Sequence, residues 1–187
     1  MIRWDDTYFE RAVLESPFRI LLHSPDKILR ELELKSGENF LDIGCGTGFL
    51  VKTASKIVGD GKVYALDNNT SYLREVSKKV ELYNLENVII LEDSAEDMST
   101  VLNESIDKAI MFFSLHHFKD RRKALENTYK KLRKNGSLLI VDPISSRSLG
   151  HGTNPREILR ISLDIGYELV KYHSGIMNYK MLLKKEE

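Results

Sequence analysis

The chain has 187 residues, enough for one domain with a sizeable core, and its 42% hydrophobic and 30% charged residues are typical of an ordinary soluble protein. Its 28 basic and 28 acidic residues balance, so the net charge gives no reason to expect binding to nucleic acid or to a membrane. We expect a cytoplasmic protein, because the single cysteine excludes an internal disulfide and the sequence has neither a signal-peptide pattern nor a membrane-spanning run.

Residues 1–23 form an N-terminal segment in which apolar and charged side chains mix and Pro17 interrupts any single helix. Two arrangements are open for it, a lid over a ligand cleft or a helix against the edge of a sheet. The core is expected over residues 24–187, beginning with a helix that Ser24 caps and Pro25 starts. We therefore expect residues 1–187 to form one domain.

The stretch from Phe40 to Leu50 predicts a buried strand, a glycine-rich turn and the start of a helix. Its polar pattern is Asp42-x-Gly44-x-Gly46-x-Gly48. A dinucleotide site would need a third glycine where Phe49 stands, and Asp42 would repel a pyrophosphate. An acid here favours a ligand with positive charge, such as the sulfonium and amino group of S-adenosylmethionine.

A second buried strand, Val63–Asp67, also ends in an acid. Asp67 follows Gly48 by close to the ~20 residues typical of a carboxylate that accepts hydrogen bonds from ribose hydroxyls. The alternative is that Asp67 caps the helix that starts near Asn68. A third strand, Val88–Leu91, leads into the acid-rich stretch 92–98. These acids either contact a ligand at the strand end or form the first turn of a helix.

The fourth strand, Ile106–Phe113, leads into Ser114, His116 and His117. In an open parallel sheet, ligands bind outside the carboxyl ends of strands where the strand order reverses, here between strands one and four. A neutral histidine at that point could accept a proton from an acceptor hydroxyl or amine. The alternative is that both histidines only position the loop.

The rest of the chain predicts a helix from Asp120 that closes at 134–136, then a fifth strand, Ser137–Asp142. Asp142 either faces the substrate or caps the next loop. That loop, 144–153, is short and polar, which favours an open or shallow acceptor pocket unless a partner chain covers it. A helix from Asn154 to Gly166 and a hairpin over 168–183 follow.

The motif Leu41-Asp42-Ile43-Gly44-Cys45-Gly46-Thr47-Gly48 resembles that of the class I methyltransferases that use S-adenosylmethionine, most closely the type-11-like small-molecule branch. The resemblance extends from about Pro25 to Lys185. It implies an α/β fold: a Rossmann-like, doubly wound, seven-stranded sheet of order 3-2-1-4-5-7-6. Such a sheet is mostly parallel, has an antiparallel C-terminal hairpin and carries helices on both faces.

The resemblance also implies roles for particular residues. Asp42 would orient the methionine end of the cofactor and Asp67 would hold the ribose. The family often has an acid just before an alanine at the adenine; here Ser94 precedes Ala95 and the acid is one place earlier, so either could make the contact. The expected cofactor-binding residues are Asp42, Gly44, Cys45, Gly46, Gly48, Asp67, Asn68, Asp93, Ser94, Ala95 and Phe113, and the candidate catalytic residues are His116 and His117.

We therefore expect S-adenosylmethionine-dependent methyl transfer to the O, N, S or C atom of a small-molecule acceptor. The chain lacks the features of three other methyltransferase classes. Enzymes that methylate exocyclic base amines have a Pro-Pro turn after strand four and protein arginine methyltransferases have paired glutamates there, whereas this chain has Phe113-Ser114-Leu115-His116. Cytosine-C5 enzymes need a nucleophilic cysteine near the acceptor, but Cys45 lies in the cofactor loop. No convincing set of Asp and Asn ligands predicts a metal. Two alternatives are a non-catalytic protein that binds the cofactor or scaffolds a partner, and a nucleotide-dependent oxidoreductase. The acceptor and a possible homo-oligomer stay open.

Overall fold

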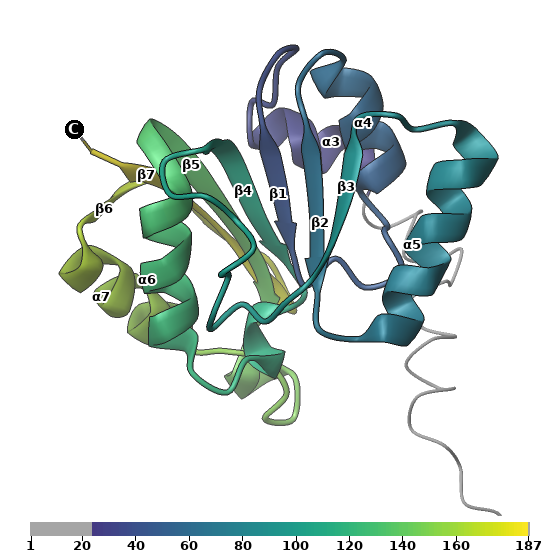
Figure 1. The fold of residues 1–187 in the computed structure, drawn as a ribbon. Coiled ribbons are helices and arrows are strands. Elements are labelled where there is room, and N and C mark those ends of the chain that lie inside the picture. Colours follow the sequence, from purple (N-terminus) through teal and green to yellow (C-terminus); the bar gives the residue numbers. More distant parts are fainter. Residues whose placement is uncertain (1–23, 187) are drawn as a thin grey trace, which may run out of the picture.

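Seven strands form one sheet in the order β3-β2-β1-β4-β5-β7-β6 in a computed structural model that describes residues 24–186 (Figure 1). The parallel part runs from β3 to β5, and β7 is antiparallel to both β5 and β6. The predicted order and the terminal hairpin are confirmed. The strands are β1 (Phe40–Ile43), β2 (Val63–Asp67), β3 (Val88–Glu92), β4 (Ile106–Phe112), β5 (Leu132–Pro143), β6 (Tyr167–Ser174) and β7 (Asn178–Lys185).

Helices cover both faces of this sheet, as the resemblance implied (Figure 1). One core contains side chains of α3 (Pro25–Glu31), α4 (Val51–Val58) and α5 (Thr70–Tyr83). The other contains side chains of α6 (Arg121–Lys131) and α7 (Pro155–Ile165). Two short 3₁₀ helices, η1 (Leu115–His117) and η2 (Ser145–Arg147), follow β4 and β5. Because both faces are covered, the central strands β1, β2 and β4 are mostly apolar.

Local sequence signals set most helix ends. The side chain of Asn69 accepts hydrogen bonds at the start of α5, and that of Asn154 does the same for α7. Gly166 ends α7 with a φ of 113°, a left-handed conformation that glycine adopts without penalty. Ser24 precedes α3 as predicted, but its side chain makes no capping hydrogen bond.

The structure decides one open alternative and corrects one boundary. Residues 92–98, for which the first turn of a helix was one of two interpretations, contain no helix, and the chain passes from β3 to β4 through turns. The helix predicted to close at 134–136 ends at Lys131, and β5 begins at Leu132, five positions before the predicted Ser137. The physical reason is strand pairing, since Leu132 is fully buried opposite Ile106 of β4.

The lid or edge role expected for residues 1–23 lies outside the described residues. Within residues 24–186, no helix combines the length and the apolar character needed to cross a bilayer.

Candidate active site

The loop after β1 lies against the end of β2. The backbone N–H groups of Gly44 and Cys45 donate to the carbonyl oxygen of Leu66, at 2.8 and 3.0 Å. The next N–H along the turn, that of Gly46, donates to Oδ2 of Asp67 at 2.8 Å. The glycine turn and Asp67, the acid that ends β2, are therefore one hydrogen-bonded unit, although Gly46 and Asp67 are 21 residues apart in sequence.

Asp67 occupies the tip of β2 and is only 8% exposed. Its Oδ1 accepts a hydrogen bond from the N–H of Asn69 at 2.9 Å, while the side chain of Asn69 caps α5. Asp67 is thus not itself the helix cap. Burial raises the pKa of this carboxyl above its ordinary value of 3.8, and hydrogen bonds from Asn69, Gly46 and Asn68 lower it in part. Each carboxylate oxygen retains capacity to accept a further donor.

The three glycines of the turn have different surroundings. A Cβ on Gly44 would lie 2.6 Å from Cβ of Ser114, so this residue allows β1 and β4 to approach closely. A Cβ on Gly48 would press on Val76 and Val51 at 3.1 and 3.3 Å. A Cβ on Gly46 would meet nothing within 4 Å. Of the three positions, only that of Gly46, whose N–H donates to Asp67, has open space where a side chain would lie.

Two expected cofactor residues lie beneath this surface. Asp42 is 2% exposed and is the third of four residues in β1. Cys45 is 6% exposed, and burial, with the nearby charges of Asp42 and Asp67, raises the pKa of its thiol well above the ordinary value. A protonated, buried thiol is a poor nucleophile, consistent with Cys45 having no role as the attacking group.

The turn after β3 is ordered by Asp93. Its Oδ1 accepts from the N–H of Ser94 at 2.7 Å, and its Oδ2 accepts from the N–H and hydroxyl of Thr100 at 3.0 and 2.9 Å. Although burial alone would raise it, these hydrogen bonds lower the pKa of Asp93 below 3.8. The N–H of Asp93 donates to the carbonyl oxygen of Asp67, which joins this turn to the tip of β2.

The other expected adenine-side residues differ in exposure. Ala95 is buried, Ser94 is partly buried and Asn68 is exposed. The predicted contacts of these residues and of Asp93 with an adenine stay predictions.

Aromatic residues mark the end of β4. Phe112 stacks on Phe49 of the glycine loop at 5.5 Å between ring centroids, and Phe113 meets Phe112 edge-on at 4.9 Å. Phe113 has a φ of 54°, which is costly for a side chain of this size. Its N–H donates to the carbonyl oxygen of Val141 at 2.7 Å, which helps to hold the strained turn. Phe113 is therefore fixed at the tip of β4, where a cofactor contact was predicted.

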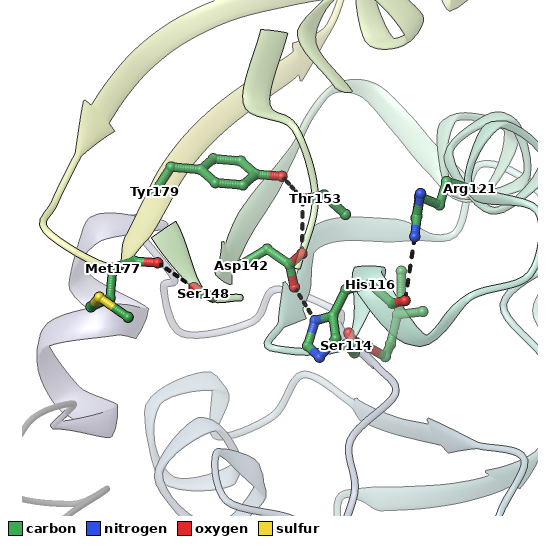
Figure 2. Close-up of polar contacts among 9 residues, drawn as sticks. Ser114, His116, Arg121, Asp142, Ser148, Thr153, Met177 and Tyr179 are labelled. Atoms are coloured by element: carbon green, nitrogen blue, oxygen red, sulfur yellow. Dashed lines mark hydrogen bonds and ion pairs between the residues drawn. The ribbon is translucent and has the colours of Figure 1, made fainter. Parts of the chain in front are cut away.

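The histidines after β4 differ in their surroundings. His116 has a side chain that is 5% exposed, and its Nδ1 lies 2.8 Å from Oδ1 of the fully buried Asp142 at the end of β5 (Figure 2). Asp142 Oδ2 accepts from the hydroxyl of Thr153 at 2.8 Å, and Thr153 is in turn 2.8 Å from the hydroxyl of Tyr179. Because Asp142 is an acceptor on both sides, His116 donates through Nδ1–H, and its Nε2 lies on the side of the ring away from Asp142.

Ser114 has a structural contact, since its hydroxyl donates to the carbonyl oxygen of Ile43 at 2.7 Å and ties β4 to β1. His117 is exposed on η1, beside His116. Sequence reasoning missed His151, Thr153 and Tyr179. Nothing in the local sequence marks them, because the loop after β5 and strand β7 reach this point only through the fold.

The arrangement fits S-adenosylmethionine. Open space at Gly46 and a buried carboxylate at the tip of β2 suit a ligand that carries vicinal hydroxyls. Strand order 3-2-1-4-5-7-6 with an antiparallel seventh strand is that of the class I methyltransferases. The fold and the site together define this class of protein.

Comparison with known proteins agrees. A family model described as a methyltransferase domain matches residues 40–136, and the chain belongs to this family. A crystal structure of a SAM-dependent methyltransferase from Aquifex aeolicus superposes with a TM-score of 0.82 and 27% identity, covering 97% of this chain and 99% of that one.

Curated relatives match over shorter stretches. A probable cobalt-precorrin-6B C(15)-methyltransferase (decarboxylating) from Sulfurisphaera tokodaii is 32% identical over 62% of this chain and 58% of its own length. A ubiquinone/menaquinone biosynthesis C-methyltransferase from Blochmanniella floridana is 36% identical over 62% of this chain and 46% of its own length. The chain thus spans about half the length of these relatives.

Proposed function

We propose that this protein transfers a methyl group from S-adenosylmethionine to a small-molecule acceptor. The observation that carries the proposal is the unit formed by the glycine turn and Asp67, with open space at Gly46. The family and the cofactor it uses support it, and the curated relatives act, by their names, on a precorrin and on quinones.

The chain's own residues would divide the work by position. Asp67 would accept hydrogen bonds from the two ribose hydroxyls, and the backbone of Gly44 to Gly48 would line the cofactor. Asp42, through the loop, would orient the methionine end. When bound, S-adenosylmethionine supplies a methyl group that its sulfonium already activates for in-line displacement, so the protein's task is to align the acceptor and exclude water.

The acceptor would lie outside the carboxyl ends of β4 and β5, next to His116. The Nε2 lone pair of this residue could take the acceptor's proton, or it could bind a metal ion. The loop 144–153 is too short to enclose the acceptor, so we propose an open acceptor site. We also propose a reducing, cytoplasmic setting, because the single cysteine is unpaired and buried.

Isothermal calorimetry with S-adenosylmethionine, its demethylated product and NAD tests this function. We expect micromolar binding of the first two, followed by transfer of a labelled methyl group in an acceptor screen that begins with precorrin- and quinone-like compounds. Binding of NAD without S-adenosylmethionine would contradict the proposal and favour an oxidoreductase. Tight cofactor binding without turnover on any acceptor would favour a binding or scaffolding protein.

A further inference from the structure

Three histidine side chains meet at the carboxyl edge of the sheet. His116 and His117 come from η1 after β4, and His151 comes from the loop after β5. One ring nitrogen from each lies within 4.8 Å of the other two. The ring centroid of His116 is 4.0 Å from that of His117 and 4.5 Å from that of His151. Two separate segments thus bring three imidazoles to one point.

The loop that carries His151 is held in place by backbone pairing. The N–H of Thr153 donates to the carbonyl oxygen of Pro143 at 3.0 Å, and the N–H of Ser145 donates to that of Thr153 at 3.1 Å. These bonds close the loop 144–153 at its base. They fix Thr153 beside Asp142 and His151 beside His116.

His116 has the second-shell support that metal-binding histidines usually have. Its Nδ1–H donates to a buried carboxylate, that of Asp142, which fixes the ring orientation (Figure 2). Asp142 is itself held by Thr153, and Tyr179 continues the network from β7. An imidazole oriented in this way is a preorganised ligand.

General-base catalysis would require only one of these imidazoles, and packing does not explain why two exposed rings, His117 and His151, lie against the buried His116. Three imidazole ligands with an open fourth position are the donor set of catalytic zinc sites. Zn–N bonds of about 2.0–2.1 Å place tetrahedral ligands roughly 3.4 Å apart, so the exposed rings need to move by on the order of 1 Å.

We propose that His116, His117 and His151 bind a divalent transition-metal ion, Zn²⁺ in the first place, with one coordination position open. This site departs from the sequence-based expectation of no metal, which considered only Asp and Asn ligands. That the open position would receive an oxygen or sulfur atom of the acceptor rests on the proposed function.

Chelator-treated full-length protein tests the site without cofactor or acceptor. Calorimetry with Zn²⁺ should give one ion per chain, and Co²⁺ should give the visible absorption of a four-coordinate site. We expect His117→Asn and His151→Asn each to weaken Zn²⁺ binding at least 100-fold. Asp142→Asn should weaken it by about 10- to 100-fold, the usual effect of removing a second-shell partner.

His173→Asn is the matched control, because His173 is exposed on β6, outside the cluster. It should leave Zn²⁺ affinity unchanged. No stoichiometric Zn²⁺ binding, or equal binding by wild type and His151→Asn, would overturn the inference. Circular dichroism spectra and urea unfolding midpoints like those of wild type show that the His117 and His151 variants are folded.

The inference and the proposed function fail separately. A protein that binds S-adenosylmethionine but not Zn²⁺ contradicts only the metal site. One that binds Zn²⁺ at the three histidines but neither S-adenosylmethionine nor its product contradicts only the proposed function.

Discussion

Asp67 is the residue on which most of the candidate cofactor site depends. It accepts one hydrogen bond from the glycine turn and one from the start of α5, so it holds these two segments together. The sequence predicted its position from strand, acid and spacing. It could not predict the bond to Gly46, which depends on how β1 and β2 pair.

Replacing Asp67 tests its role with the ribose. We expect Asp67→Ala to weaken S-adenosylmethionine binding by about 1–3 kcal/mol, because charge-assisted hydrogen bonds are lost. Calorimetry measures the change. Asp60→Ala, an exposed acid in the turn before β2, is the control and should bind like wild type. Unchanged affinity in Asp67→Ala would remove this residue from the site.

The raised pKa of Asp67 predicts how cofactor binding depends on pH. For folding, a raised pKa means that the folded state favours the protonated carboxyl more than the unfolded state does. The contribution of Asp67 to stability is therefore present below its pKa in the unfolded chain and is lost as the pH rises through its pKa in the folded protein. Cofactor binding has the opposite sign, because ribose hydroxyls donate to the ionised carboxylate.

We therefore expect S-adenosylmethionine affinity to fall as the pH is lowered into the acidic range, and to begin falling at a higher pH than an aspartate of ordinary pKa would give. Calorimetry over a pH series measures it. Asp67→Asn should lose most of this dependence. An equally steep pH dependence in Asp67→Asn would assign the titration to another group.

At the scale of elements, the glycines in the turn between β1 and α4 have different surroundings. Gly44 lies against Ser114 of the neighbouring strand end, whereas Gly46 faces open space, and both have positive φ, 70° and 55°. A side chain at either position is strained, but only one at Gly44 also meets a neighbour.

Alanine at the two positions should therefore have different effects. We expect Gly44→Ala to lower the free energy of unfolding by about 2–4 kcal/mol, because strain and overpacking add. Gly46→Ala should cost about 1–2 kcal/mol of stability and in addition weaken cofactor binding, since its methyl group would enter the proposed site. Urea unfolding and calorimetry measure the two quantities. Equal cofactor affinity in Gly46→Ala and wild type would contradict the placement of the cofactor.

At the scale of the whole molecule, the terminal hairpin completes both the core and the site. β7 lies between β5 and β6, and its Tyr179, Met181 and Leu183 are fully buried. Tyr179 also contacts Thr153, which binds Asp142. Tyr179 of β7 thus belongs to the hydrogen-bond network that orients His116, a residue that follows β4.

This packing predicts a large loss of stability on truncation of a β7 side chain. Met181→Ala should lower the free energy of unfolding by about 2–5 kcal/mol, because a fully buried side chain leaves a cavity. Val170→Ala on β6, where the side chain is 53% exposed, is the control and should stay within about 0.5 kcal/mol. Urea unfolding gives both values. A similar loss in the two variants would mean that β7 is not the buried strand described.

The sequence by itself determined the succession of elements along the chain and the glycine turn with its flanking acids, because apolar strands, caps and glycines are local signals. The class of fold and its strand order followed from the resemblance of the glycine motif to that of the class I methyltransferases. It predicted less well where α6 ends, since the switch to strand at Leu132 depends on pairing with Ile106. Only the tertiary structure decided that Asp142 orients His116 and that His151 joins His116 and His117. Such contacts join segments distant in sequence, and their geometry is set by the pairing of β4, β5 and β7 rather than by any local pattern.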